Sequence, residues 1–287
     1  MNTTVRLELG RWQDTLADVE CDALIVDAPY SARTHGGHDG APTVGRSTFG
    51  AANGGTHGNH RAQEATGYGT KRRWRKDRGA WETEYDAPRR AIDYAGWHPE
   101  DVREFVDHFA PRTRGWFVTI SDHALARTWD ECLAAHAHDR YVFAPLPWFA
   151  PGSRVRLAGD GPSSWTCWIV VARPRSGTHR DGTKWSKWGT LPGGYNITSD
   201  RGSPVVGAKP IDLMRALVRD YSRPGDVICD PCAGGGTTGR AAQLEGRGFI
   251  GAETDPDTFA KAQERLARPF TAPLLIDTEE AEQGALL

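Results

Sequence analysis

Two short segments, far apart in the chain, each combine a carboxylate with residues that form turns. The first is Asp27-Ala28-Pro29-Tyr30, which follows the apolar run Ala23-Leu24-Ile25-Val26. The second is Asp230-Pro231-Cys232-Ala233-Gly234-Gly235-Gly236-Thr237-Thr238, which follows Val227-Ile228-Cys229. Each has the form of a strand that ends in a turn. In an open α/β sheet, ligands bind at such turns, in the crevice beyond the carboxyl ends of the strands.

The glycine-rich turn suits a ligand that comes close to the backbone. Its glycines leave room for that approach, and the helix that follows offers free N–H groups. The next strand ends in Glu253, and an acid at that place in a β–α–β unit accepts hydrogen bonds from ribose hydroxyls. Asp230 would repel a pyrophosphate and attract an ammonium or sulfonium group. The turn therefore favours a cationic cofactor such as S-adenosylmethionine over a dinucleotide.

The segments that must position these turns alternate between strand and helix patterns. Strands are expected at residues 5–9, 22–26, 115–120, 140–145, 165–172, 227–229 and 248–252. Helices are expected at 99–109, 123–137, 210–221, 237–245 and 257–267, with a helical turn at 14–18. This alternation predicts an α/β fold with a mostly parallel twisted sheet and helices on both faces.

Two segments interrupt the alternation. Residues 31–90 are rich in Gly, His, Thr and Arg and contain few aliphatic side chains, so they are expected to form a long basic loop or mobile insertion after the turn of Asp27 to Tyr30. Residues 173–208 carry Gly, Pro, Ser and Lys/Trp with little periodicity and form a second surface module. The acidic tail beyond Pro269 is expected to fray.

Length and composition limit the class of protein. A chain of 287 residues with 38% hydrophobic residues suits one large α/β domain over residues 1–287. No apolar stretch is long enough for a membrane helix, and the N-terminus lacks the apolar core of a signal peptide, which predicts a cytoplasmic protein. A net charge of -2 excludes a polycation, so any affinity for nucleic acid must come from local patches.

Two such patches interleave cations with tryptophan. The first contains Lys71, Arg72, Arg73, Arg75 and Lys76 around Trp74. The second contains Lys184 and Lys187 beside Trp185 and Trp188. This composition suits the neutralisation of phosphates together with stacking on exposed bases, although a solvated basic loop would look similar.

Cysteine and histidine give little sign of a metal site. The five cysteines are an odd number and scattered, which favours reduced thiols. Cys229 and Cys232 form a C-x-x-C, but the chain has no second cysteine pair for zinc. Two H-x-x-H pairs, His35 with His38 and His57 with His60, lack support from cysteines or acids. We therefore expect no metal.

With these motifs in order, the chain resembles the amino-methylating DNA methyltransferases of the permuted β arrangement. Asp230 to Thr238 is similar to the family's D-P-F-x-G-x-G-T-T cofactor loop, with Cys232 in place of Phe. Lys209-Pro210 resembles the K-P element that precedes it, and Gly251 to Pro256 resembles G-x-E-x-D-P. Asp27-Ala28-Pro29-Tyr30 resembles the catalytic D-P-P-Y. The resemblance implies a Rossmann-like methyltransferase fold, circularly permuted motif order and S-adenosylmethionine as cofactor.

The resemblance also assigns site residues, with two departures. The cofactor-binding set is Lys209, Pro210, Asp230, Pro231, Cys232, Ala233, Gly234, Gly236, Thr237, Thr238 and Glu253. The family commonly has Gly-Asp where this chain has Gly10-Arg11, so Asp14 or the face of Trp12 is the expected substitute contact to the cofactor's adenine. Ala28 replaces a proline whose backbone carbonyl does the work. Alanine keeps that carbonyl, so activity should survive.

The implied chemistry is methylation of an exocyclic amino group. The lone pair of such a nitrogen is delocalised into the base, and acceptors on its hydrogens, the Asp27 carboxylate and the Ala28 carbonyl, would draw it toward tetrahedral geometry. Tyr30 would stack on the base. The base must be flipped out of double-stranded DNA, which costs a few kcal/mol that other contacts must offset.

Several alternatives stay open at this level. Asp at the head of the tetrapeptide leans toward adenine N6 in this family, but N4 of cytosine remains an alternative, as do an RNA or protein-amide methyltransferase and a non-catalytic nucleic-acid-binding module. Residues 173–208 are the expected target-recognition segment, with 31–90 as a second candidate. A homodimer, a nucleoid association in a bacterial or phage setting, and a role in restriction-modification beside a separate nuclease are compatible with the sequence. The sequence recognised on DNA does not follow from the chain.

Overall fold

The computed structural model describes residues 4–34, 70–75, 80–85, 95–151, 164–198, 205 and 207–269, with only the backbone described in 70–75 and 80–85. The helices are α1 (Trp12–Thr15), α4 (Pro99–Phe109), α5 (Ala126–Ala135), α6 (Ile211–Tyr221), α7 (Thr237–Leu244) and α8 (Pro256–Ala267), with a 3₁₀ turn η1 at Trp185–Lys187. The strands are β1 (Val5–Leu9), β2 (Ala23–Asp27), β3 (Thr70–Arg75), β4 (Ala80–Tyr85), β5 (Phe117–Ser121), β6 (Arg140–Val142), β7 (Leu146–Phe149), β8 (Thr166–Pro174), β9 (Tyr195–Asn196), β10 (Val227–Asp230) and β11 (Gly248–Glu253).

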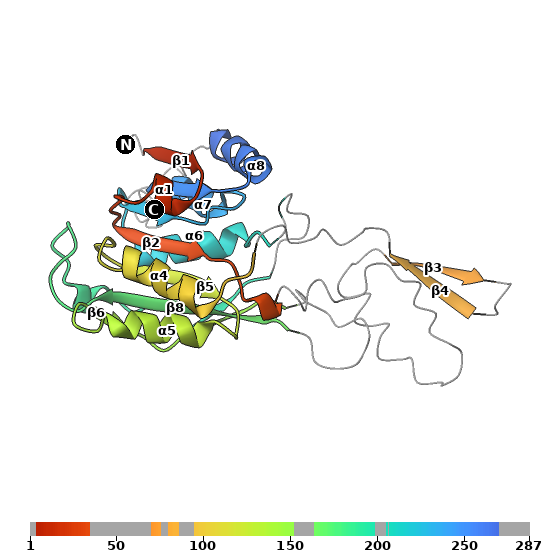
Figure 1. The fold of residues 1–287 in the computed structure, drawn as a ribbon, viewed down its shortest axis with the longest axis horizontal. Helices are drawn as coiled ribbons and strands as arrows, with labels where there is room; N and C mark the ends of the chain where they lie inside the picture. The colour runs from red at the N-terminus through yellow and green to blue at the C-terminus, as the bar shows by residue number, and fades with distance from the viewer. Residues whose placement is uncertain are drawn as a thin grey trace, which may run out of the picture.

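One nine-stranded mixed sheet organises the molecule, in the order β1-β11-β10-β2-β5-β8-β7-β9, with β6 also paired to β8 (Figure 1). The strands from β1 to β5 in this order are parallel to one another. β8 runs antiparallel to β5, and β7 and β6 run antiparallel to β8. The predicted α/β fold is confirmed. Its parallel half carries the two acid-bearing turns.

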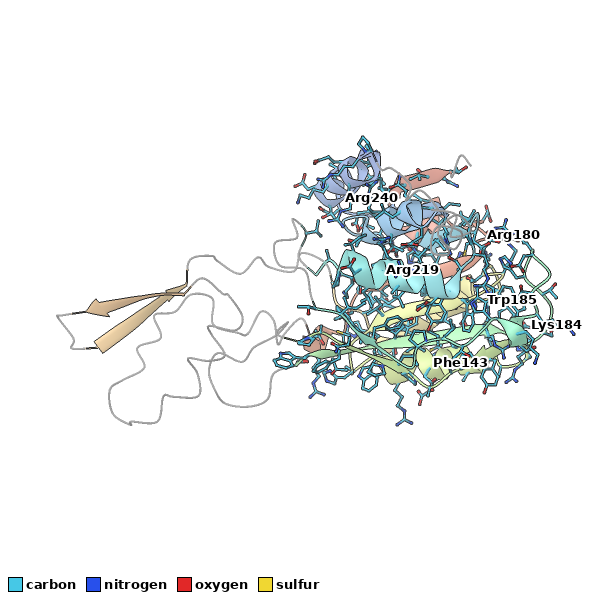
Figure 2. All side chains as sticks on the ribbon, turned by 180° about the vertical axis from the view of Figure 1, so that it is seen from behind. Phe143, Arg180, Lys184, Trp185, Arg219 and Arg240 are labelled. Carbon is cyan, nitrogen blue, oxygen red and sulfur yellow. The ribbon has the colours of Figure 1, made fainter. Side chains whose placement is uncertain are left out.

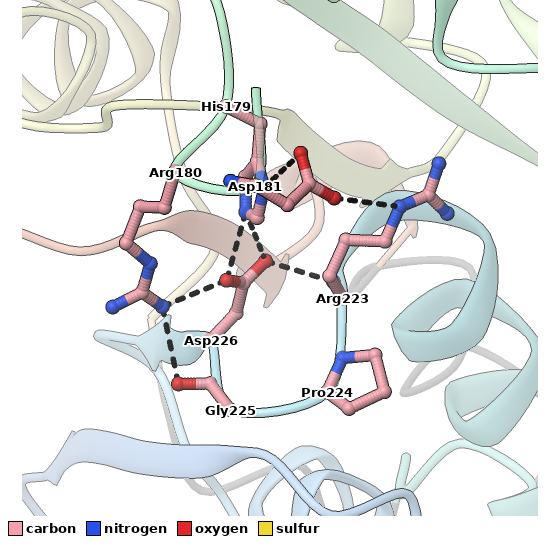
Figure 3. A pocket seen from close by; sticks show the side chains of 7 residues that line it. All are labelled: His179, Arg180, Asp181, Arg223, Pro224, Gly225 and Asp226. Atoms are coloured by element: carbon pink, nitrogen blue, oxygen red, sulfur yellow. Dashed lines mark hydrogen bonds and ion pairs between the residues drawn. The ribbon is translucent and has the colours of Figure 1, made fainter. Parts of the chain in front are cut away.

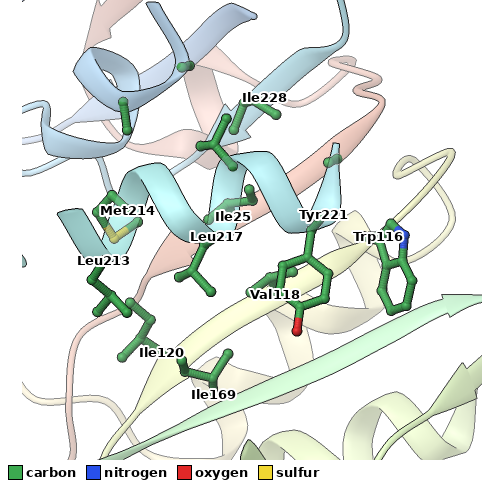
Figure 4. Packing of buried hydrophobic residues seen from close by; sticks show 14 of the residues in the cluster. Ile25, Trp116, Val118, Ile120, Ile169, Leu213, Met214, Leu217, Tyr221 and Ile228 are labelled. Atoms are coloured by element: carbon green, nitrogen blue, oxygen red, sulfur yellow. The ribbon is translucent and has the colours of Figure 1, made fainter. Parts of the chain in front are cut away.

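Alternation along the strands explains why helices cover both faces. Successive side chains of a strand point to opposite faces. Ile25 of β2 therefore packs with Leu217 and Tyr221 of α6 on one face (Figure 4), while its neighbour Val26 packs with Phe105 of α4 on the other. The strands are apolar on both sides for this reason.

The helix termini follow from local sequence. α4 begins with Pro99, and the carboxylate of Asp101 accepts a hydrogen bond from the backbone N–H of His98 at 2.7 Å. α8 begins after Asp255, whose side chain accepts a hydrogen bond from the N–H of Thr258 at 2.7 Å. The expected helices were placed close to their observed bounds because proline and acids mark both starts.

The predicted strand at 140–145 ends early in the structure, at Val142, and a second strand that was not predicted begins at Leu146. β6 pairs with the end of β8, β7 pairs with its beginning, and residues 143–145 separate them. Pro145 lacks an N–H and cannot continue a ladder of hydrogen bonds, which explains the break. The sequence also gave no signal for the antiparallel direction of these strands.

Two expectations for the interrupting segments need correction. Within 31–90, residues 70–75 and 80–85 form a two-stranded antiparallel sheet rather than an unstructured loop, with Trp74 opposite Trp81. Within 173–208, Trp185 and Trp188 are buried in the core next to Trp116, so stacking of these rings on exposed bases is wrong.

In the described part of the chain, the helices are too short or too polar to cross a membrane.

Candidate active site

The carboxyl ends of the five parallel strands lie along one edge of the sheet, and a polar or glycine residue stands at the end of each strand or just after it. From β1 to β5 these residues are Gly10, Glu253, Asp230, Asp27 and Asp122. β10 and β2 are neighbours, and the chain leaves them toward opposite sides of the sheet. Such a topological switch point is where open α/β sheets bind ligands. The structure thus brings together the two acid-bearing turns that are far apart in the sequence.

Asp230 is a buried carboxyl group whose environment penalises its charge. Its side chain is 1% exposed. Burial raises the pKa of Asp230 to about 7, hydrogen bonds from Thr238 and Cys232 lower it, and the charges of Asp27 and Glu253 raise it further. The Cys232 N–H donates to Asp230 Oδ1 at 3.1 Å. A cation beside this carboxyl group would therefore be strongly favoured.

Asp27 is paired with Lys209 on one oxygen only. Lys209 Nζ donates to Asp27 Oδ2 at 2.5 Å, while Asp27 Oδ1 is buried and has no hydrogen-bond partner among the residues that the structure describes. Burial raises the pKa of Asp27, and the charge and hydrogen bond of Lys209 act in the opposite direction. The free oxygen is an acceptor that a ligand's N–H group could satisfy.

The rest of the tetrapeptide is held firmly. Ala28 is buried, and Tyr30 is 7% exposed with its hydroxyl 3.5 Å from Cys167 Sγ of β8. Lys209 Nζ lies 4.7 Å from the centre of the Tyr30 ring. The predicted stacking of a base on Tyr30 stays a prediction, and on this face of the ring it requires Lys209 to move.

Asp122 is a functional candidate that the sequence reasoning missed. Its Oδ2 accepts hydrogen bonds from Ser31 Oγ (2.5 Å), from the Ser31 N–H (3.0 Å) and from the hydroxyl of Thr34. Its Oδ1 accepts from the N–H of Leu125 at 2.9 Å. Burial alone would raise the pKa of Asp122, but these hydrogen bonds hold it below its ordinary value. The acid directly after the strand 115–120 was the available signal.

The glycine-rich turn is shaped by close contacts. Gly234 and Gly236 have positive φ angles of 51° and 72°, which favour glycine. A Cβ atom on Gly235 would lie 2.8 Å from the side chain of Val205. Thr237 and Thr238 open α7, so the N-terminus of that helix faces the same edge of the sheet. Such a turn leaves room for a ligand against the backbone.

Glu253 and the segment after β1 lie side by side, as the two predicted adenosine contacts require. Gly10 N–H donates to the backbone oxygen of Glu253 at 2.8 Å, and Asp14 is exposed. Trp12 does not offer a free face, because it is buried against Phe105 and Phe109 of α4. Of the two substitutes for the family's Gly-Asp acid, only Asp14 keeps an accessible side chain.

The second basic patch lies at the opposite edge of the sheet. Arg180 contacts Asp22, just before β2. His179 and Arg180 both contact Asp226, just before β10 (Figure 3). Lys184 and Trp185 lie close by (Figure 2), and the Trp185 ring packs over Gly115, just before β5. Lys184 and Lys187 are exposed but lie at the amino ends of the strands, away from Asp27 and Asp230. Contact of these lysines with DNA stays a prediction.

The remaining predicted site residues fall into three groups. Side chains of Lys71, Arg72, Arg73 and Arg75 lie outside the described part of the structure, although the backbone of these residues forms β3. Lys76 and the four histidines of the H-x-x-H pairs lie outside the described residues. Cys229 and Cys232 are free thiols, and burial contributes to raising the pKa of both, so they are protonated at neutral pH.

The donor set of the site fits a cationic cofactor that carries a ribose. Asp230 is a buried acid with no ion pair in the described part of the chain, and Glu253 and Asp27 add negative charge beside it. The glycines leave space at the backbone, and Glu253 ends the strand next to Asp230. Lys209 and Pro210 lie before α6, with Lys209 turned toward Asp27.

Comparisons with known proteins point the same way. Residues 180–264 match the model of the N6/N4 methyltransferase family, which is described as DNA methylase. The chain is 35% identical over 80 residues to DNA adenine methyltransferase YhdJ of Escherichia coli, which covers 27% of each protein. It is 40% identical over 58 residues to type II methyltransferase M.HinfI of Haemophilus influenzae, which covers 20% of this chain and 16% of that protein. The matched segments thus span about a quarter or less of these curated relatives.

Solved structures extend the likeness to nearly the whole chain. The complex of M1.HpyAVI with SAM has a TM-score of 0.57 at 15% identity and covers 92% of this chain and 100% of that one. PvuII DNA methyltransferase, which is cytosine-N4-specific, has a TM-score of 0.51 at 13% identity and covers 98% and 92%. The protein therefore has the fold of these DNA methyltransferases, and its residues 180–264 match the N6/N4 DNA methylase family model.

Proposed function

We propose that this protein is an S-adenosylmethionine-dependent DNA methyltransferase that transfers a methyl group to the exocyclic N6 amino group of adenine. The observation that carries the proposal is that Asp27 and Asp230 end two neighbouring strands, β2 and β10, at the switch point of the sheet. One acid has an unpartnered oxygen for an amino group, and the other is a buried acid that favours a cation.

The cofactor would be held by the glycine-rich turn, Asp230 and Glu253, and when bound it supplies an electrophilic methyl group. Asp230 would face its positive charge, and the backbone of the turn at Gly234, which is only partly buried, would pack against it. Glu253 would accept hydrogen bonds from ribose hydroxyls. The exclusion of bulk water by the buried floor of this site strengthens each of these electrostatic contacts.

Asp27 and Ala28 would act on the target amine. The Asp27 carboxylate and the Ala28 carbonyl each accept a hydrogen bond from the amino group, which directs the nitrogen lone pair toward the methyl group. Asp27 must be ionised to do so. Since burial raises the pKa of Asp27 and Lys209 opposes that effect, the rate of transfer should fall as the pH drops through the pKa of this group.

Adenine is the proposed target, and N4 of cytosine is the alternative. Relatives of the chain include a DNA adenine methyltransferase, while a structural neighbour is cytosine-N4-specific. The Asp at the head of the tetrapeptide supports adenine by resemblance. The substrate is proposed to be double-stranded DNA with a flipped base, and an RNA or protein-amide substrate is a weaker alternative because the insertion is large and basic.

Nucleoside mass spectrometry tests the proposal directly. The purified protein is incubated with unmethylated genomic DNA and S-adenosylmethionine that carries a deuterated methyl group, and the DNA is then hydrolysed. Deuterated N6-methyladenine is expected. Deuterated N4-methylcytosine would overturn the choice of base, and the absence of both would overturn the proposed activity.

Asp27→Asn is the matched control for that measurement. The amide keeps the shape of the side chain but loses the negative charge, and one lost electrostatic stabiliser costs roughly 10²- to 10³-fold in rate. Cofactor binding, measured by calorimetry, should be retained in this variant. Sequencing of the methylated DNA would then define the recognised sequence.

A further inference from the structure

Lys209 makes three contacts that converge on the proposed target site. Its Nζ donates to Asp27 Oδ2 at 2.5 Å and to the backbone oxygen of Gly207 at 3.1 Å, and it lies 4.7 Å from the centre of the Tyr30 ring. The side chains of Lys209 and Asp27 are only 10% and 23% exposed. The lysine therefore closes over the acid and the ring together.

These partners are those that the proposed function assigns to the target base. An exocyclic amine would donate to the Asp27 carboxylate, and its base would stack on Tyr30. The ammonium group of Lys209 is also a nitrogen donor, and its positive charge is attracted to the face of an aromatic ring. The Lys209 nitrogen thus already occupies one of the two Asp27 carboxylate oxygens and one face of the Tyr30 ring.

We propose that Lys209 is an internal occupant of the amine-binding site, and that the flipped base enters by displacing its ammonium group from Asp27 and Tyr30. This proposal rests on the proposed function. It assigns Lys209 a positioning role in the acceptor half of the site, beyond the cofactor contact implied by resemblance. Without a base, the lysine supplies a counter-charge that opposes the rise in the pKa of Asp27 caused by burial.

The surroundings of Lys209 suit a side chain that exchanges between two positions. Gly207, two residues before it, has a φ of 80° that favours glycine, and Pro210 directly after it begins the turn into α6. Asp27 Oδ1 remains without a partner, so an incoming N–H group can bind before the lysine leaves. Displacement can therefore proceed without a stage in which the carboxylate has no donor.

Chemical labelling tests the contact in the free protein. The protein is treated with a low concentration of acetyl N-hydroxysuccinimide ester, and the acetylation rate of each lysine is read by mass spectrometry. Lys209 should react more slowly than the exposed Lys187. Asp27→Asn should raise the rate at Lys209 roughly tenfold or more, the order expected from the loss of a hydrogen bond between charged groups, without changing Lys187. A rate at Lys209 that equals Lys187 in the wild type, or that is unchanged in Asp27→Asn, would overturn the proposal.

Kinetics of Lys209→Met and Lys209→Arg test the displacement. At saturating cofactor, and with a short duplex that contains the recognised sequence, Lys209→Met should lower the KM for DNA because no ammonium group must leave. The acid limb of its pH–rate profile should move to higher pH because Asp27 loses its counter-charge. Lys209→Arg should keep the wild-type acid limb. An unchanged or raised KM in Lys209→Met, or an unmoved acid limb, would contradict displacement.

The two tests separate this proposal from the proposed function. Protection of Lys209 that depends on Asp27, in a protein that methylates no DNA, would leave the contact intact and overturn the activity. Methylation by a protein whose Lys209 is as reactive as Lys187 would leave the activity intact and overturn the role of the lysine.

Discussion

At the scale of single residues, the site is defined by carboxyl groups that lie close together with too few positive charges around them to balance their own. Asp230 is 1% exposed, and both Asp27 and Glu253 contribute unfavourable charge to it. A carboxyl group in such a place costs stability when it ionises, and a cationic ligand recovers that cost. The ionised acids therefore lower the stability of the free protein and raise its affinity for a cation.

Asp230→Asn should make this cost measurable. Because burial raises the pKa of Asp230 to about 7 from 3.8, its contribution to stability is complete below pH 4 and is lost as the pH rises through 7. A shift of this size corresponds to about 4 kcal/mol at most. Asn keeps an oxygen for the Cys232 N–H and carries no charge, so the variant should unfold at a higher temperature than the wild type at pH 8.

The comparison needs the free protein and two pH values. Thermal unfolding at pH 4 should give nearly equal midpoints for Asp230→Asn and the wild type, and the difference should open between pH 4 and pH 8. Cofactor affinity should fall in the variant. A stability difference that does not depend on pH would contradict the assignment of the raised pKa to this group.

At the scale of elements, Asp122 links the end of β5 to the segment that follows the tetrapeptide. Its hydrogen bonds to Ser31 and Thr34 fix the chain directly after Tyr30. The turn that carries the Ala28 carbonyl is therefore held from β2 on one side and from β5 on the other. This arrangement explains how an alanine can replace the more rigid proline at that position.

Ser31→Ala should affect catalysis more than stability. Loss of the hydroxyl removes two hydrogen bonds, one to Asp122 Oδ2 and one from the Thr34 N–H, each worth about 1 kcal/mol of stability. It leaves the bonds of Asp122 to the Thr34 hydroxyl and to the Ser31 N–H. The rate of methyl transfer should fall by a larger factor because the turn loosens beside the reacting nitrogen. Ser31→Thr, which restores a hydroxyl, should recover activity, and equal rates in all three proteins would refute a positioning role.

The glycine-rich turn and the segment before α6 are also coupled. A methyl group on Gly235 would meet Val205 at 2.8 Å, whereas Gly193 has open space around its Cβ position. Gly235→Ala should therefore displace the 205–209 segment or the turn, and cofactor affinity should fall. Forcing an extra methyl group into a packed contact costs roughly 1–3 kcal/mol.

Gly193→Ala is the matched control for that variant. It should leave cofactor affinity and thermal stability close to the wild-type values, since no atom of the described residues lies within contact distance of the added methyl group. If calorimetry gives Gly235→Ala the same cofactor affinity as Gly193→Ala, the contact with Val205 has no role in shaping the turn.

Most of the helices and the parallel strands could be predicted from the sequence, because these elements have strong local signals. The acid-bearing turns, the helix start at Pro99 and the strand of Val227 were all visible in short windows. The antiparallel half was not, since strand direction is set by pairing between distant segments. Trp185 and Trp188 were misread because an aromatic ring beside lysines looks the same whether it faces solvent or the core.

The site residues also divide into those with a local signal and those without one. Asp27, Asp230 and Glu253 could be found because each ends a buried strand, and the topology then brings them together. The contact partners of these acids that lie far away in the sequence could not be found. The Asp27–Lys209 pair and the Asp122–Ser31 contact join residues separated by 182 and 91 positions, respectively. No short sequence window reports such contacts.

At the scale of the whole molecule, the long insertion has its two ends side by side next to the turn of Asp27 to Tyr30. Tyr30 O accepts a hydrogen bond from the Trp97 N–H at 2.9 Å, and Ser31 and Trp97 form a parallel bridge. A Cβ on Gly96 would lie 2.7 Å from the backbone nitrogen of Ala32. The chain thus leaves the fold and returns to it at one point, without a strand of the nine-stranded sheet between.

Replacing residues 35–94 with a short glycine linker should therefore preserve the fold. The ends already adjoin, so closing the shorter loop carries no entropic penalty relative to the longer one. Thermal stability and cofactor affinity should stay close to the wild type. Affinity for duplex DNA should fall strongly, because the first basic patch, Lys71 to Lys76, is removed. Its five cations predict a salt dependence less steep by up to about 4 in the slope of log K against log salt concentration.

A charge-neutralised insertion separates the effect of charge from that of length. Substituting Gln for Lys71, Arg72, Arg73 and Arg75 keeps the full chain, and it should reproduce most of the loss of DNA affinity and most of the change in salt slope. A variant with Gln in place of Lys184 and Lys187, at the opposite edge of the sheet, serves as the comparison. If that second variant loses as much DNA affinity as the first, the DNA must reach the amino ends of the strands, and the insertion is not the main electrostatic contact. If neither variant changes the slope, neither patch binds phosphate.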